Sequence, residues 1–106
     1  MRVLFDQGTP VPLRRGLPLH SVETALERGW ATLLNGDLRQ AAENAGFEVM
    51  ITTDQNLQYQ QNLAARRIAI IVLNTTSWPR IRAATEAIAS AVARCATERL
   101  IEISIP

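Results

Sequence analysis

The sequence predicts an α/β fold with three α/β/α layers: a mainly parallel sheet of four to five strands with helices on both faces. Two observations predict it. Short apolar segments that suit strands alternate with segments that carry a helical apolar stripe. The connections between them are short, and this alternation is typical of parallel sheets with right-handed crossovers. No linker or repeat divides the 106 residues, so 1–106 is expected to form one domain.

The first strand is expected at Arg2–Phe5, an apolar run that Asp6-Gln7-Gly8 ends. A short helix should follow, because Thr9 suits an N-cap and Pro10 suits a first helical position. Pro18 limits its length.

A second strand is expected at His20–Ala25, which alternates weakly between apolar and polar residues. A helix should begin near Asn35 and end at Gly46, which suits the position after a helix. Phe47–Thr52 then reads as the third strand. The stripe of this helix consists of Leu38, Ala41, Ala42 and Ala45.

The second half of the chain predicts a short helix at Leu57–Ala65 and a fourth strand at Ile68–Leu73. The continuous apolar run of that strand suits burial on both faces. A long helix should start near Pro79, and Leu100–Ile105 should form a half-exposed edge strand. The core stripe of the long helix consists of Ile81, Ala84, Ile88, Ala91 and Cys95.

The composition excludes several kinds of chemistry. All eleven basic residues are arginine, which removes Schiff-base chemistry, a lysine base and a P-loop. The single cysteine excludes an intrachain disulfide. No stretch approaches the ~20 apolar residues of a membrane span, so no membrane partner and a cytoplasmic location are expected.

The three aspartates of the chain are the strongest candidates for a site. Asp6 ends the first predicted strand, Asp54 ends the third, and Asp37 opens the helix between the second and third. Strand ends and helix starts of this kind meet at one edge of a parallel sheet. Converging carboxylates repel one another unless a cation lies among them, and Mg²⁺ or Mn²⁺ suits such oxygen ligands. Each residue also has a structural alternative: Asp37 as a helix-dipole partner, and Asp6 or Asp54 as turn residues.

Three stretches resemble the PIN-like domains, in particular the short bacterial PIN-like proteins of uncharacterised function. They are RVLFDQGTP at Arg2–Pro10, LNGDLRQAAENAGFEVMITTDQNL at Leu34–Leu57 and IAIIVL at Ile68–Leu73. The resemblance covers nearly the whole chain, and its specificity lies in the order and spacing of the motifs.

The resemblance implies a metal-dependent endoribonuclease, as in the toxins of toxin–antitoxin pairs, with RNA as substrate and an antitoxin protein as partner. Asp6, Asp37 and Asp54 match its catalytic and metal-binding acids, with Mg²⁺ or Mn²⁺ as cofactor. Asn56 stands where the family often has a further acid, and its amide offers a ligand oxygen without a charge. A homodimer is also expected.

Five polar residues near the aspartates are candidates for RNA binding, through phosphates, sugars or bases. The alternative for each is an ordinary solvated surface position. They are Gln7, Arg14, Arg15, Gln55 and Gln58.

Two other functions compete with the ribonuclease. The first is a catalytically weak or inactive PIN-like module that binds RNA or a protein, which Asn56 favours. The second is a phosphoacceptor receiver domain with Asp54 as acceptor. Receiver domains need an acidic pair after the first strand and a lysine after the last, whereas Asp6 stands alone and the chain has no lysine.

Overall fold

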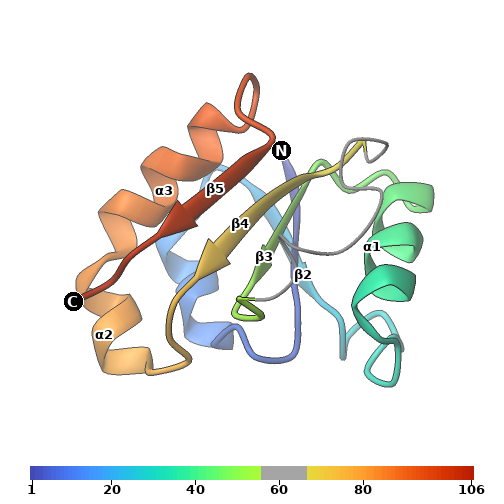
Figure 1. Ribbon diagram of the computed structural model, residues 1–106, viewed down its shortest axis with the longest axis horizontal. Coiled ribbons are helices and arrows are strands. Elements are labelled where there is room, and N and C mark those ends of the chain that lie inside the picture. The colour runs from blue at the N-terminus through green and yellow to red at the C-terminus, as the bar shows by residue number, and fades with distance from the viewer. Residues whose placement is uncertain (56–66) are drawn as a thin grey trace.

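The computed structural model describes residues 1–55 and 67–106, and its elements alternate between strands and helices along the chain (Figure 1). They are β1 (Arg2–Phe5), the 3₁₀-helix η1 (Val11–Gly16), β2 (Ser21–Thr24), α1 (Asn35–Asn44), β3 (Val49–Thr52), β4 (Ala69–Leu73), α2 (Trp78–Ala83), α3 (Thr85–Arg94) and β5 (Leu100–Ile103). The five predicted strands are confirmed, with ends that shift by one or two residues. The helix expected at 57–65 lies outside the described residues.

The five strands form one parallel sheet in the order β2-β1-β3-β4-β5. β1 is therefore an inner strand, and β5 is an edge strand as its alternating sequence predicts. The predicted α/β class with a parallel sheet is confirmed.

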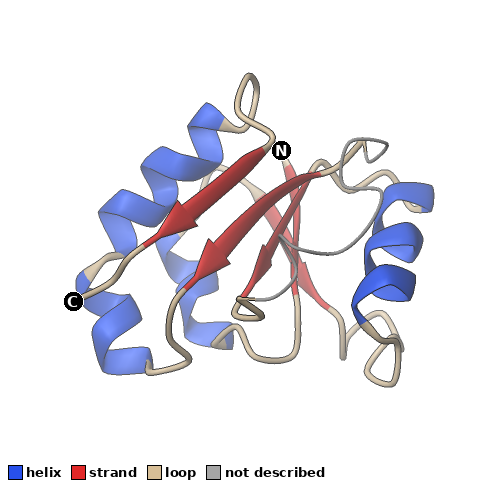
Figure 2. Ribbon diagram, in the orientation of Figure 1, coloured by secondary structure: helices blue, strands red, loops and turns tan. Residues whose placement is uncertain are grey.

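The inner strands bury both of their faces, because alternate residues of a strand point to opposite sides of the sheet. In β3, Val49 and Ile51 belong to the core cluster that η1, α2 and α3 cover, whereas Met50 belongs to the cluster under α1. All three side chains are at most 1% exposed. Figure 2 shows the resulting layers, with α1 on one face of the sheet and η1, α2 and α3 on the opposite face.

One connection departs from the predicted right-handed crossovers. From β1 the chain passes η1 and steps outward to β2, while from β4 it passes α2 and α3 and steps in the opposite direction to β5. Both connections cover the same face of the sheet, so they must have opposite hands. The left-handed one joins β4 to β5 (Figure 1). The short η1 cannot cover this face alone, and α2 and α3 complete the cover.

The helix expected from Pro79 to Cys95 is broken at Ala84, whose φ of −105° and ψ of 13° depart from helical values. The side chain of Thr85 donates a hydrogen bond to the carbonyl of Arg82 at 2.8 Å. A threonine hydroxyl that bonds a backbone carbonyl in this way competes with the helical ladder. The apolar stripe continues across the break, which explains why the sequence predicts one helix.

The end of α1 agrees with its prediction. Gly46 adopts a left-handed φ of 85°, the conformation that glycine favours just after a helix. The carbonyl of Ala45 accepts a hydrogen bond from the guanidinium of Arg2, which joins the end of α1 to the start of β1. In the described part of the chain, every helix is too short or too polar to cross a lipid bilayer.

Candidate functional site

The carboxyl ends of β1 and β3 form the candidate site. The strand order reverses here, because the chain steps from β1 outward to β2 and then returns past β1 to β3. Open parallel sheets bind ligands in the crevice at such a switch point. Asp6 directly follows β1 and Asp54 lies just past β3, so two of the predicted residues flank this point.

The carboxylate of Asp6 is held by Thr9. Its Oδ1 accepts a hydrogen bond from the Thr9 backbone N–H at 3.1 Å and lies 2.7 Å from the Thr9 hydroxyl oxygen. The same hydroxyl lies 3.0 Å from the carbonyl oxygen of Ile51, so its single proton has two possible acceptors. Thr9 is only 3% exposed. The prediction that Thr9 caps the following helix is wrong, because Pro10 precedes η1 and no side chain caps it.

Thr52 connects the two aspartates. Its hydroxyl donates a hydrogen bond to Oδ2 of Asp6 and accepts one from the backbone N–H of Asp54 at 3.0 Å. Thr52 is 1% exposed, so water does not compete for these bonds. A single hydroxyl therefore positions the carboxylate after β1 relative to the backbone after β3.

The loop after β1 also packs closely against the segment after β3. A Cβ added at Gly8 would overlap the hydroxyl oxygen of Thr53, and it would lie 3.8 Å from Oδ1 of Asp6. Glycine fits here because the side chain of Thr53 packs directly against its backbone, which brings the loops after β1 and β3 to the same point of the edge.

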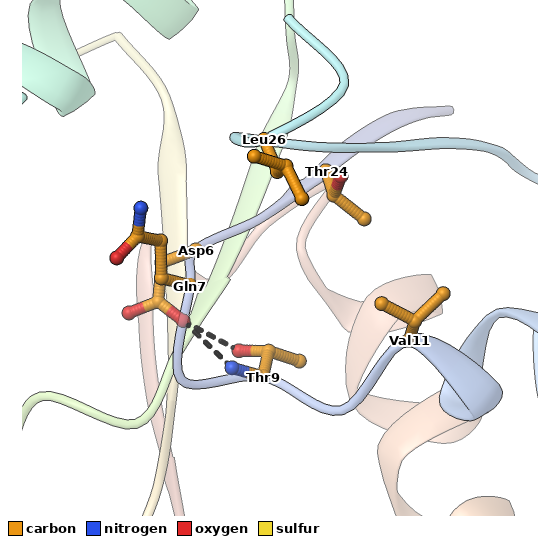
Figure 3. Close-up of a pocket in the computed structure, with 6 residues that line it drawn as sticks. All are labelled: Asp6, Gln7, Thr9, Val11, Thr24 and Leu26. Atoms are coloured by element: carbon orange, nitrogen blue, oxygen red, sulfur yellow. Dashed lines mark hydrogen bonds between the residues drawn. The ribbon is translucent and has the colours of Figure 1, made fainter. Parts of the chain in front are cut away.

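A cavity of about 260 Å³ opens beside Asp6 (Figure 3). The polar side chains of Asp6 and Thr9 form one wall, and the apolar side chains of Val11 and Leu26 lie across from them. Val11 is 53% exposed and Leu26 is 73% exposed, so the apolar walls face solvent. The lining consists of Asp6, Gln7, Thr9, Val11, Thr24 and Leu26. A flat organic group could rest on the apolar wall with its polar part toward Asp6.

Hydrogen bonds fix the walls of this cavity. The side-chain amide of Gln7 donates to the carbonyl of Ala31, and Arg14 forms an ion pair with Glu27. Glu27 in turn accepts a hydrogen bond from the backbone N–H of Thr24 at 2.9 Å. The hydrogen bond from Arg14 is the main cause that lowers the pKa of the Glu27 carboxyl, and the bond from Thr24 adds to it. The side chain of Arg14 thus already has an ion-pair partner within the fold.

Asp37 lies exposed in the first turn of α1, which begins at the carboxyl edge of the sheet, where Asp6 also lies (Figure 1). Within residues 1–55 and 67–106, no three carboxylate, imidazole or thiol groups come together as a metal-holding cluster. The convergence of Asp6, Asp37 and Asp54 on one ion therefore stays a prediction.

Two of the remaining candidates, Gln55 and Arg15, lie among the described residues, and two do not. The side chain of Gln55 donates to the carbonyl of Asn74 at 3.3 Å and so joins the end of β3 to the end of β4. Arg15 is exposed and lines a second cavity. Asn56 and Gln58 lie outside the described residues.

The sequence matches no family model, and no curated protein or solved structure is significantly similar to it. The resemblance to PIN-like domains therefore stays a hypothesis that rests on the motifs of the chain itself.

The structure adds three residues to the candidate site that the sequence did not predict there. The hydroxyl of Thr9 and the apolar side chains of Val11 and Leu26 belong to the candidate site. The sequence carries one signal for Thr9. A threonine three residues after an aspartate suits a turn in which the aspartate carboxylate accepts a hydrogen bond from the threonine backbone N–H. No local pattern marks the other two.

Proposed function

We propose that the protein is a metal-dependent endoribonuclease that hydrolyses RNA at the carboxyl edge between β1 and β3. One observation carries the proposal: Asp6 and Asp54 follow neighbouring strands at the switch point, and the Thr52 hydroxyl connects them. The resemblance to PIN-like domains supports the same chemistry.

The side chains present fit a hard divalent cation. Oδ2 of Asp6 accepts one hydrogen bond among the described residues, and a carboxylate oxygen can accept more than one partner. Together with the Asp54 carboxylate it would hold Mg²⁺ or Mn²⁺, with Asp37 or Asn56 as a further ligand. The bound ion would activate a water and stabilise a phosphoryl oxygen.

The rest of the site would orient the ligands and the substrate. Thr9 and Thr52 hold the Asp6 carboxylate in one position. Its side chain would therefore lose less conformational entropy when a metal binds. The cavity beside Asp6 would hold the sugar or base next to the scissile phosphate, with Val11 and Leu26 against its apolar surface.

The proposal is tested by cleavage of a fluorescently labelled single-stranded RNA in the presence of Mn²⁺. Asp6→Asn and Asp54→Asn should each lose cleavage, and EDTA should stop the wild-type reaction. Glu102→Gln removes an exposed carboxylate on β5, away from the site, and should cleave like wild type. Thermal unfolding of each variant shows that the loss is not a loss of folding. Equal cleavage by Asp6→Asn would contradict the proposal.

A second candidate function is a PIN-like module that binds RNA or a protein without catalysis. The bonds from Thr9 and Thr52 favour it, since they give Asp6 a structural role in holding two loops together. Titration calorimetry with Mn²⁺ separates the two functions. Absence of binding at millimolar Mn²⁺, together with intact RNA binding, would favour the module over the nuclease.

The expected antitoxin and homodimer also remain proposals. Light scattering on the purified protein tests the homodimer, and co-expression with a neighbouring small reading frame tests the antitoxin.

A further inference from the structure

A second cavity, of about 560 Å³, is formed by η1, α2 and α3, the helices that cover one face of the sheet. It is lined by Pro12, Arg15, Gly16, Trp78, Arg82 and Thr85. Its lining comes from two segments far apart in the sequence, and it combines two cations with one large aromatic ring and no carboxylate.

The two arginines are available to an anion. Arg15 and Arg82 are exposed, and neither has an ion pair or hydrogen bond from its side chain to any residue in the described part of the chain. The arginines next to them in the sequence do have partners: Arg14 pairs with Glu27, and Arg80 donates to the carbonyl of Ile105 at 2.6 Å. The unpartnered guanidinium groups thus gather at the cavity, and guanidinium matches the geometry of a phosphate group.

Trp78 provides the second chemical feature. It is half-buried, with part of its surface packed against the core cluster and part lining the cavity. An indole held in this way is a rigid platform on which a nucleobase can stack. A phosphopeptide would match the arginines but would leave the aromatic surface without a flat partner.

We propose that this cavity binds one nucleotide of a single-stranded RNA, with the base stacked on Trp78 and the phosphates between Arg15 and Arg82. The inference extends the proposed function by assigning a binding subsite away from the aspartates. Val11 lines the cavity beside Asp6, and the next residue, Pro12, lines this one. A strand that crosses the start of η1 would therefore occupy both.

The test measures binding without catalysis. A fluorescein-labelled oligouridine 12-mer is titrated in EDTA, with fluorescence anisotropy and tryptophan emission recorded together. Arg15→Gln/Arg82→Gln should weaken binding at least about tenfold and reduce the salt slope by about 1.4, since each phosphate contact on a single strand contributes about 0.7. The matched control Arg67→Gln/Arg94→Gln removes the same charge from two exposed positions and should keep the wild-type slope.

Tryptophan emission reports on stacking. The oligonucleotide should quench the wild-type protein, and the quenching should be largely lost in Trp78→Phe, which leaves Trp30 as the remaining tryptophan. Trp78→Phe should bind more tightly than Trp78→Leu, because a phenyl ring still stacks. Circular dichroism and thermal unfolding verify that these variants fold.

Three outcomes would overturn the inference: unchanged binding by the double arginine variant, an equal loss in the control variant, or equal competition by a phosphoserine peptide. An oligothymidine arm shows how far the 2′-hydroxyl matters. If the wild type binds through these residues but never cleaves RNA, the proposed nuclease fails and the subsite stands. If it cleaves RNA and the arginine variants bind normally, the proposed nuclease stands and the subsite fails.

Discussion

The buried hydroxyl of Thr52, the last residue of β3, donates a hydrogen bond to the carboxylate of Asp6, which directly follows β1. It also accepts the backbone N–H of Asp54. This threonine side chain thus contacts both carboxylate-bearing segments, which makes it a direct point at which to test the site.

Thr52→Val should destabilise the protein by roughly 1–3 kcal/mol, because the substitution keeps the shape but leaves the N–H of Asp54 without its partner. Urea denaturation measures the change. In the nuclease assay, cleavage should fall by roughly 10–100-fold, as for residues that orient metal ligands. The exposed Thr97→Val serves as control and should stay within about 0.5 kcal/mol of wild type. A Thr52→Val protein as stable as the control would show that the hydroxyl is dispensable.

Gly8→Ala should cost roughly 1–3 kcal/mol, because the new Cβ would overlap the hydroxyl of Thr53 and push apart the loops after β1 and β3. Thr53→Ala removes the obstructing oxygen. The double variant should therefore be more stable than the sum of the two single changes predicts, by at least about 0.5 kcal/mol. Penalties that simply add would mean that the two loops do not constrain each other.

Gly46→Ala should lower the free energy of unfolding by about 1–2 kcal/mol, because a left-handed φ of 85° is unfavourable for alanine. The added Cβ would also lie 3.0 Å from a guanidinium nitrogen of Arg2. Gly36→Ala is the matched control, since it lies in the first turn of α1 with open space around it. It should be neutral or stabilising in the same thermal unfolding measurement. Equal melting temperatures for the two variants would contradict the conformation of Gly46.

The thiol of Cys95 should react slowly in the folded protein. It is 3% exposed, and burial raises its pKa above the ordinary value of 9.0. A colorimetric disulfide reagent at pH 8 should label the native protein far more slowly than the protein in urea. Rapid labelling without denaturant would show that the side chain is accessible.

The same pKa shift has a consequence for alkaline stability. Because the thiol of the unfolded chain ionises first, stability should begin to fall as the pH rises above 9.0, and Cys95→Ala should lack this contribution. Urea denaturation at several alkaline pH values compares the two slopes.

The sequence was sufficient for the parts of the fold that local patterns determine. The run from Ala69 to Leu73 is apolar throughout and forms a strand that is buried on both faces, as predicted. The break at Ala84 could not be predicted, because the apolar stripe passes through it unchanged. The left-handed connection from β4 to β5 depends on which face of the sheet the other helices leave uncovered. That is a property of the assembled sheet and not of a local sequence pattern.

The candidate site divides in the same way. Asp6 and Asp54 were found because each follows a strand, and the structure places these strands side by side. The role of Thr9 depends partly on the carbonyl of Ile51, and the second cavity joins Arg15 to Arg82, so sequence spacing gives no signal for either. Contacts between distant parts of the chain decide these features.

The position of η1 beneath α3 also determines the order in which the molecule can be completed during synthesis. A Cβ at Gly16 would overlap the methyl group of Thr85, so the two helices touch directly. A nascent chain that ends before α2 would leave Leu13 and Leu17 without the helices that bury them here. The wall that η1 gives to both cavities would thus become fixed late, after most of the sheet has left the ribosome.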